Sequence, residues 1–343
     1  MMIEPKTIKL FCCDLNWTYF DHPFPHTPPS MPQDWAFIDP DAYYDWHMNF
    51  GNNVMFCQAY TFCGYAFYPT KFGPVAPAQG SQLLPRLFQR SQKDGIPFWS
   101  YFCVGTDLIL SNLRNEWILP GSREFGHFGF LAPESPWTDL LCARIEEFLS
   151  QYPVDWLLFD WFVYGSLKPD QYRLQPTWYN QEWYKKIIGR SFPQNPAEIS
   201  PEETLLYKRE VLAWQFYRIR DVVKKTSPTT KIVFNVPYWE AAEPLWVDHP
   251  MLNESDGLLA ESSQEHIVYW LLAIRKPNQR VITTIIGRLD EEGICDPYSW
   301  QKWYAKGCDF MGYAWGTPPD FRPHPSYQRS LAVVKRAFEQ IKS

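Results

Sequence analysis

Short apolar runs recur along the chain, and most of them are separated by segments with helical periodicity. Eight runs are assigned as strands, at residues 7–14, 53–60, 97–104, 154–160, 231–237, 257–261, 280–286 and 309–315. They are mostly unbroken rather than alternating, which is typical of parallel strands covered on both faces. Eight alternations of strand and helix predict an α/β fold of the (β/α)8 TIM-barrel type.

Helix start signals support this order of elements. Each places a capping side chain before a proline at the first helical position: Asp39-Pro40, Ser135-Pro136, Ser200-Pro201 and Asp296-Pro297. Long connections follow the third strand, at 104–133, and the fourth, at 161–199. Because they are long and rich in aromatic residues, we expect them to wall a cleft over the barrel mouth. No repeat or change in composition divides the chain, so residues 1–343 are predicted to form one catalytic domain.

Composition narrows the classes of function. A length of 343 residues suffices for a barrel of about 250 residues with insertions. No stretch approaches the roughly 18 apolar residues of a membrane span. The net charge is −6 with acidic and basic residues interspersed, which argues against nucleic acid or a membrane surface as partner. The start of the chain carries no signal peptide, which predicts a cytoplasmic protein, or a secreted or periplasmic one whose signal has been removed.

Polar and aromatic residues gather where the predicted strands end. In a barrel these carboxyl ends meet at one mouth, where active sites are built. Carboxylates and amides suit the hydroxyls of a sugar, and aromatic rings suit its apolar face. The sequence therefore predicts a carbohydrate as partner. The candidate substrate-binding residues are Asp14, Asn16, Trp17, Tyr60, Asp107, Trp161, Asn235, Tyr238, Trp239 and Trp315.

Two acids stand out because each ends a short apolar strand, Asp160 at 154–160 and Glu261 at 257–261. Glycoside hydrolysis usually needs two carboxyl groups that flank the scissile bond. We predict that Asp160 is the nucleophile and Glu261 the acid/base, with Glu261 protonated at rest and Asp160 ionised. Asp160 as a turn-capping acid is the structural alternative. Glu265 is a weaker choice because it completes a capping box with Ser262.

Other chemistries have little support. The seven His residues show no HxH or HExxH spacing, the eight Cys form no CxxC pair, and no GxSxG motif or phosphate-binding glycine loop occurs. We expect no metal and no cofactor. Two alternatives to a hydrolase stay open: a barrel that binds carbohydrate without cleaving it, and a transglycosylase or lyase that acts on a polysaccharide. The oligomeric state is also open, a homo-oligomer included.

Three stretches resemble the α-L-fucosidase-like barrel glycosidases, which include glycoside hydrolase family 29 and hypothetical glycosyl hydrolases related to it. They lie at 132–161, 189–235 and 307–316, and the first leads into Leu158-Phe159-Asp160-Trp161. The resemblance implies a retaining, exo-acting glycosidase whose fourth-strand aspartate, here Asp160, is the nucleophile. Glu261 fits the acid/base by position. The histidine motif of true fucosidases is missing near residues 11–17, so fucose, galactose, rhamnose and arabinose all remain candidate sugars.

Overall fold

The structure is a computed structural model, and it describes residues 4–15, 35–124, 129–166, 172–236, 243–261, 265–285, 299–315 and 325–342. The strands are β1 (Lys9–Asp14), β2 (Met55–Tyr60), β3 (Phe98–Cys103), β4 (Trp156–Asp160), β5 (Lys231–Asn235), β6 (Gly257–Ala260), β7 (Arg280–Thr284) and β8 (Asp309–Trp315). The predicted eight strands are confirmed, with ends that differ by two residues or fewer.

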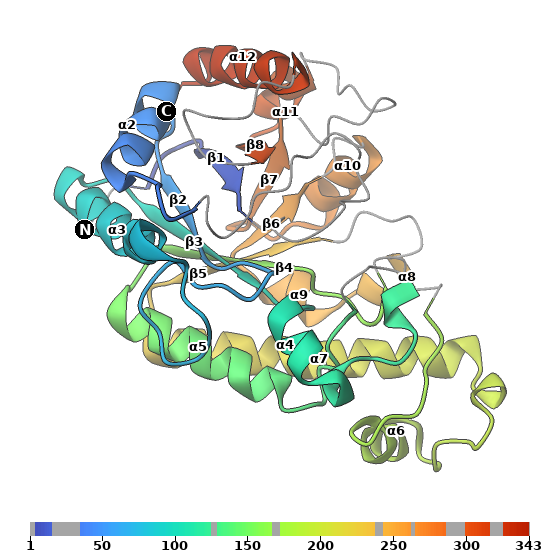
Figure 1. The fold of residues 1–343 in the computed structure, drawn as a ribbon. Coiled ribbons are helices and arrows are strands. Elements are labelled where there is room, and N and C mark those ends of the chain that lie inside the picture. The colour runs from blue at the N-terminus through green and yellow to red at the C-terminus, as the bar shows by residue number, and fades with distance from the viewer. Residues whose placement is uncertain are drawn as a thin grey trace.

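Helices surround the strands (Figure 1). The described α-helices are α2 (Pro40–Phe50), α3 (Leu83–Asp94), α4 (Leu108–Leu113), α5 (Trp137–Gln151), α6 (Asn180–Ile188), α7 (Pro201–Thr226), α8 (Glu243–Trp246), α9 (Pro250–Glu254), α10 (Glu265–Ile274), α11 (Ser299–Ala305) and α12 (Pro325–Gln340). Short 3₁₀ turns lie at Ala78–Gln82, Asn115–Trp117, Ser122–Glu124 and Pro196–Glu198. The two long connections therefore contain helical segments of their own. None of the described helices has the length and apolar character needed to cross a bilayer.

The sequence signals explain where the helices start. Asp39 accepts hydrogen bonds from the first turn of α2, and Ser200 forms a full capping box with Glu203 at α7. Helix α5 begins one residue later than predicted, at Trp137, whose N–H donates to the Ser135 hydroxyl at 3.3 Å. The predicted start at residues 296–297 lies outside the described residues.

All neighbouring strands are parallel, in the order β1-β8-β7-β6-β5-β4-β3-β2. The seam between β1 and β2 is closed largely by amide side chains instead of a backbone ladder. Asn53 accepts from the Lys9 N–H at 2.8 Å and donates to the Thr7 carbonyl at 2.7 Å. At the other end of the seam, Gln58 accepts from the Leu15 N–H at 3.0 Å. These bonds complete a TIM barrel.

Aromatic residues fill both sides of the barrel wall. Phe102, Phe159 and Phe234 lie on the outer face, where the ring of Phe159 contacts the other two. Phe148 of α5 packs on Phe102, and Phe216 of α7 packs on Phe234. Side chains alternate between the two faces of a strand. Trp99 and Trp156 therefore point inward, where their rings stack with centroids 4.7 Å apart. Much of the aromatic content thus forms the core.

Candidate functional site

A single amide joins the two predicted catalytic acids. Asp160 ends β4, Asn235 ends β5 and Glu261 follows β6. The Asn235 Nδ2 donates to Asp160 Oδ1 at 2.9 Å and to Glu261 Oε2 at 2.7 Å. These two carboxylate oxygens can lie no farther apart than the sum of the two distances, about 5.6 Å. The structure therefore brings Asp160 and Glu261 to one place at the carboxyl ends of the strands.

Asp160 accepts hydrogen bonds from neutral donors. Besides Asn235, the backbone N–H of Trp161 donates to Oδ1 at 2.7 Å, and the Tyr101 hydroxyl donates to Oδ2 at 3.0 Å. Tyr101 and Asn235 are buried, whereas Asp160 and Glu261 are half-buried. The pair is thus held firmly from the barrel wall and keeps some access to solvent.

The charge state of Asp160 differs from the prediction. Burial raises its pKa to about 7, and the charge of Glu261 acts in the same direction. The hydrogen bonds from Asn235, Trp161 and Tyr101 oppose this rise because they favour the ionised form. This raised pKa does not match the expectation of an ordinary, fully ionised Asp160. Among the described residues the side chain faces a second carboxylate, and its hydrogen-bond donors are all uncharged.

A third carboxylate, Asp14, lies on the same inner face. Its Oδ1 accepts from Gln58 Nε2 at 3.1 Å, and its Oδ2 accepts from the Tyr313 hydroxyl. Beside it in β1, the pKa of the buried Cys12 thiol is raised by burial and by the charges of Asp14, Glu261 and Asp160. The charges of all three acids therefore raise the pKa of the same thiol, which places the three carboxylates near one another. Asp14 therefore lies near the carboxylate pair, and its contact with substrate stays a prediction.

The structure places Tyr60 on the outer side of the barrel instead. Gln58 pairs with Tyr101 in the register of β2 and β3, but Tyr60 pairs with Phe102, so one extra residue is inserted between them. Such a bulge reverses the alternation of side chains. The Tyr60 hydroxyl consequently bonds Thr70 at 2.9 Å, and Arg144 of α5 stacks on its ring. The predicted contact of Tyr60 with substrate does not fit this position.

Asp107 also lies among structural partners. Its Oδ2 accepts from Arg144 Nη1 at 2.7 Å, and both side chains are almost fully buried. Its Oδ1 accepts from the Leu110 N–H and caps α4. Both oxygens of Asp107 are thus engaged between α4 and α5, and a role in holding sugar hydroxyls does not fit this position.

Trp161 connects the site to the loops above it. Its backbone has a φ of 55°, in the left-handed region that bulky residues rarely adopt. Its ring packs against Phe62 and Phe130, with centroids 6.1 Å away in each case. A Cβ on Gly105 would collide with the Trp161 carbonyl oxygen. The loops after β3 and β4 therefore pack closely against each other at Gly105. At this contact Trp161 has its left-handed backbone conformation, and its N–H donates to Asp160.

Several predicted residues lie outside what the structure describes. Asn16, Trp17, Tyr238 and Trp239 are among the residues without a description. Trp315 ends β8 opposite Asp14 in the register, but its side chain is not described. The weaker acid candidate, Glu265, pairs with Lys302 at 2.8 Å on the exposed surface of α10. The substrate contacts of the four undescribed residues and of Trp315 stay predictions.

The sequence-based candidates were limited to the last residue of each predicted strand and the residues beyond it. Tyr101, Gln58 and Tyr313 were therefore missed. Tyr101 precedes the end of β3 by two residues, and Tyr313 precedes the end of β8 by two. Residues two apart in a strand point to the same face. A search of the inward-facing residues two positions before each strand end would have identified both tyrosines.

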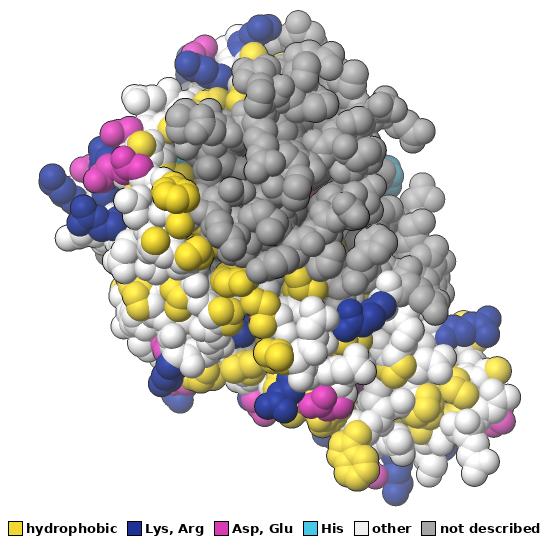
Figure 2. All heavy atoms as spheres, viewed as in Figure 1, with side chains coloured by type: hydrophobic (Ala, Val, Ile, Leu, Met, Phe, Trp, Pro, Cys, Tyr) yellow, Lys and Arg dark blue, Asp and Glu magenta, His cyan; other side chains and the backbone are white. Residues whose placement is uncertain are grey.

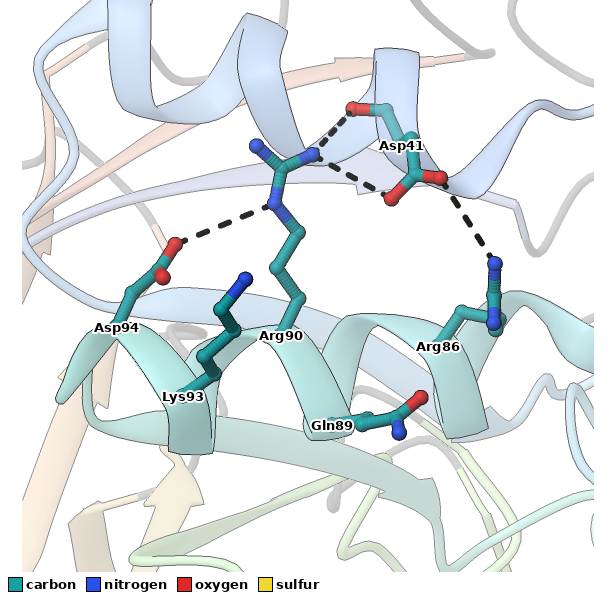
Figure 3. Close-up of a pocket in the computed structure, with 6 residues that line it drawn as sticks. All are labelled: Asp41, Arg86, Gln89, Arg90, Lys93 and Asp94. Carbon is teal, nitrogen blue, oxygen red and sulfur yellow. Dashed lines mark hydrogen bonds and ion pairs between the residues drawn. The ribbon is translucent and has the colours of Figure 1, made fainter.

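A surface pocket of about 670 Å³ lies elsewhere, between α2 and α3 (Figure 3). Arg90 spans it, with Asp41 at 3.4 Å and Asp94 at 4.0 Å, and Arg86 approaches the other oxygen of Asp41. Acidic and basic side chains lie next to one another over these helices (Figure 2). The pocket contains no strand-end residue, so it is separate from the carboxylate pair. In the described part of the chain, no three His, Cys, Asp or Glu side chains form a group suited to hold a metal ion.

Comparison with known proteins shows similarity of fold. No protein-family model and no curated protein matches the chain. Among solved structures, α-L-fucosidase isoenzyme 2 from Paenibacillus thiaminolyticus has a TM-score of 0.65 at 14% identity over 89% of this chain, which spans 46% of that protein. The unliganded α-L-fucosidase AlfC from Lactobacillus casei has a TM-score of 0.50 at 12% identity, covering 90% of this chain and 81% of AlfC. The chain thus shares the barrel of α-L-fucosidases and spans less than half of the first of them.

Proposed function

We propose that this protein is a retaining, exo-acting glycoside hydrolase in which Asp160 is the nucleophile and Glu261 the acid/base. The observation that carries the proposal is the spacing of the pair, because the Asn235 amide holds one oxygen of each acid within about 5.6 Å of the other. Retaining glycosidases place their carboxyl groups about 5–5.5 Å apart, whereas inverting enzymes need roughly 6.5–9.5 Å to admit a water molecule.

The reaction follows from these positions. An oxygen of Asp160 attacks the anomeric carbon while the glycosidic C–O bond breaks, and Glu261 gives its proton to the departing oxygen. Glu261 then takes a proton from water, which attacks the same carbon and releases Asp160 as a carboxylate. The two steps together retain the anomeric configuration. No further reactant is needed besides water.

Asn235 is suited to more than holding the acids apart. Its Nδ2 is used by both carboxylates, but its Oδ1 is buried and has no partner among the described residues. A buried acceptor without a donor costs free energy, and a ligand that supplies the donor recovers it. We therefore assign a sugar hydroxyl to this oxygen, which keeps Asn235 in the predicted substrate-binding set together with Asp14.

The proton of the pair determines the pH range of activity. Attack requires ionised Asp160, and burial together with the charge of Glu261 raises the pKa of this group to about 7. Interacting acids titrate as a unit, so the productive form is the one in which Asp160 is charged and Glu261 carries the proton. Loss of the last proton from the pair removes the general acid, so we expect kcat/KM to fall as the pH rises above about 7.

The substrate class is an α-L-fucoside or a related glycoside. The fold similarity to α-L-fucosidases supports this class, together with the resemblance of the stretch that ends at Asp160. The carboxylates and the aromatic residues at the strand ends suit a neutral sugar more than a phosphorylated one. Fucose, galactose, rhamnose and arabinose are therefore the sugars to test first.

A panel of 4-nitrophenyl glycosides of these four sugars, in both anomeric forms, tests the proposal. Wild type should release 4-nitrophenol from at least one of them. Asp160→Asn should lose this activity and still bind the sugar in isothermal titration. Asp107→Asn is the matched control because the same substitution falls on the outer side of the barrel, and it should keep kcat wherever the protein is folded.

The product identifies the mechanism. Proton NMR of the first product should show the anomer of the substrate, which is the signature of retention. Inversion, or turnover that persists in Asp160→Asn, would overturn the assignment of Asp160 as nucleophile. Sugar binding without turnover in wild type would favour a carbohydrate-binding barrel, and transfer to a second sugar in place of water would indicate a transglycosylase.

A further inference from the structure

Tyr101 reaches the proposed nucleophile from inside the barrel. It lies opposite Leu158 in the register of β3 and β4, two residues before the level of Asp160. Its side chain is buried, and its hydroxyl donates to Asp160 Oδ2 at 3.0 Å. The hydrogen bond therefore reaches Asp160 from one layer deeper in the barrel.

The two oxygens of Asp160 are not equivalent. Each carboxylate oxygen accepts about two hydrogen bonds. Oδ1 receives two, from the Trp161 N–H and the Asn235 amide. Within the described residues, Oδ2 receives one hydrogen bond, and it comes from Tyr101. Oδ2 is thus the oxygen that retains an acceptor position, and an electron pair, for the anomeric carbon.

We propose that Tyr101 is a positioning residue that holds Asp160 Oδ2 as the attacking oxygen and favours its ionised form. This inference rests on the proposed glycosidase function and adds a role for a residue in the barrel interior. A hydrogen bond to a carboxylate stabilises the charged form over the neutral one. The Tyr101 hydroxyl thereby counteracts the charge of Glu261, which favours protonation of the same group.

The same bond assists both chemical steps. When Oδ2 bonds to the anomeric carbon, its charge is lost and the hydrogen bond from Tyr101 weakens. When water releases the sugar, the negative charge returns to Asp160 and the bond regains its full strength. Tyr101 therefore stabilises the leaving carboxylate in the second step and sets its orientation in the first. The phenol exchanges no proton in either step.

Tyr101→Phe tests the role without substrate. The pKa of Asp160 is followed by NMR of protein labelled with ¹³C at the aspartate carboxyls, and its signal is identified by its absence in Asp160→Asn. Loss of one hydrogen bond to the charged form should raise this pKa by about one unit. Tyr60→Phe is the matched control, because Tyr60 is also buried but lies on the outer face of the barrel wall and should leave the signal unchanged. Melting temperatures verify that both variants are folded.

Kinetics provide the second measurement. The basic limb of the kcat/KM profile should move to higher pH in Tyr101→Phe by the same amount as the NMR pKa, and stay in place in Tyr60→Phe. An unshifted Asp160 signal, or lost activity with an unshifted profile, would overturn the role of Tyr101. A shifted signal in a protein that cleaves none of the glycosides would support the effect of Tyr101 on Asp160 and overturn the proposed hydrolase.

Discussion

Two aspartates follow neighbouring strands of the barrel and have opposite environments. Asp107 comes after β3, and its oxygens are taken by the Arg144 guanidinium and the first turn of α4. Asp160 ends β4, and its oxygens accept from uncharged donors while Glu261 stands across the Asn235 amide. Both are acids at predicted strand ends, yet one faces α5 and the other faces the barrel interior.

The difference separates a structural acid from a candidate catalytic one. A buried carboxylate paired with a buried cation is compensated, and removing one partner leaves the other uncompensated. A carboxylate that faces a second carboxylate has a raised pKa, and the proximity is unfavourable for folding. Perturbed acids of this second kind are concentrated at functional sites. The charged group next to an acid therefore says more about whether the acid is structural or catalytic than its position at a strand end does.

Substituting each aspartate in turn should give opposite results. Asp160→Asn is expected to lower kcat by roughly 10³-fold or more, because the amide is a poor nucleophile, without loss of stability. Asp107→Asn should cost about 3–5 kcal/mol of folding free energy by leaving Arg144 buried and unpaired, while kcat of the folded protein stays near wild type. Chromogenic assays and urea unfolding measure the two effects.

Arg144→Met in the Asp107→Asn background is the control for the stability effect. With the cation removed, no uncompensated charge remains, so part of the lost stability should return. If the double variant is no more stable than Asp107→Asn alone, the ion pair is not the cause of the loss. If Asp107→Asn lowers kcat as much as Asp160→Asn does, the distinction between the two acids fails.

Glu261→Gln should separate the roles within the pair. Loss of a general acid costs about 10²–10⁴-fold for a substrate with a poor leaving group. A dinitrophenyl glycoside needs little protonation, so its first step should be far less affected. The substitution also removes the charge that raises the pKa of Asp160, so this pKa should fall in the NMR titration of the aspartate carboxyls. An equal loss for good and poor leaving groups would contradict the acid/base role.

Gly105→Ala should disturb the site through the backbone of Trp161. The added Cβ collides with the Trp161 carbonyl, so the loop after β4 must shift and take its N–H away from Asp160. Misplacement of a reacting group by about 1 Å can cost roughly 10²-fold in rate. Gly95→Ala is the control, because it strains a helix C-cap at a φ of 69° with open space around it. Equal activity losses in the two variants would indicate a general loss of stability instead.

The fold could be predicted because its signals are local. An apolar strand such as 154–160 and a helix cap such as Ser200 can each be recognised from a few consecutive residues. The barrel was predicted from the first kind of signal and the start of α7 from the second. The closure of the seam by Asn53 and Gln58 could not be predicted, since it depends on which strands become neighbours at the two ends of the sheet.

The site was predicted only in part. Asp160, Asn235, Glu261 and Asp14 were chosen as polar strand-end residues, and the structure brings them together. Tyr60 was misplaced because a bulge after Gln58 reverses the alternation, and nothing in the sequence marks the extra residue. The raised pKa of Asp160 was not predicted either, since it depends on the distance to Glu261 on a strand that is not adjacent in sequence.

The smallest expected effect is a dependence of stability on pH that belongs to Asp160. Its pKa is near 7 in the folded protein and near 3.9 in an unfolded chain. Between these values the folded state holds a proton that the unfolded state has released, so the free energy of unfolding falls as the pH rises from about 4 to 7. The loss is about 1–3 kcal/mol, because a half-buried carboxyl is partly screened by solvent.

Asp160→Asn has no such proton, so its stability should exceed that of wild type by an amount that is near zero at pH 4 and largest above pH 7. Asp107→Asn keeps Asp160 and its proton, so its stability should fall with pH over the same range as that of wild type. Urea unfolding of the three proteins across this range measures it, and parallel curves for wild type and Asp160→Asn would mean that the two carboxylates do not share an unfavourable charge.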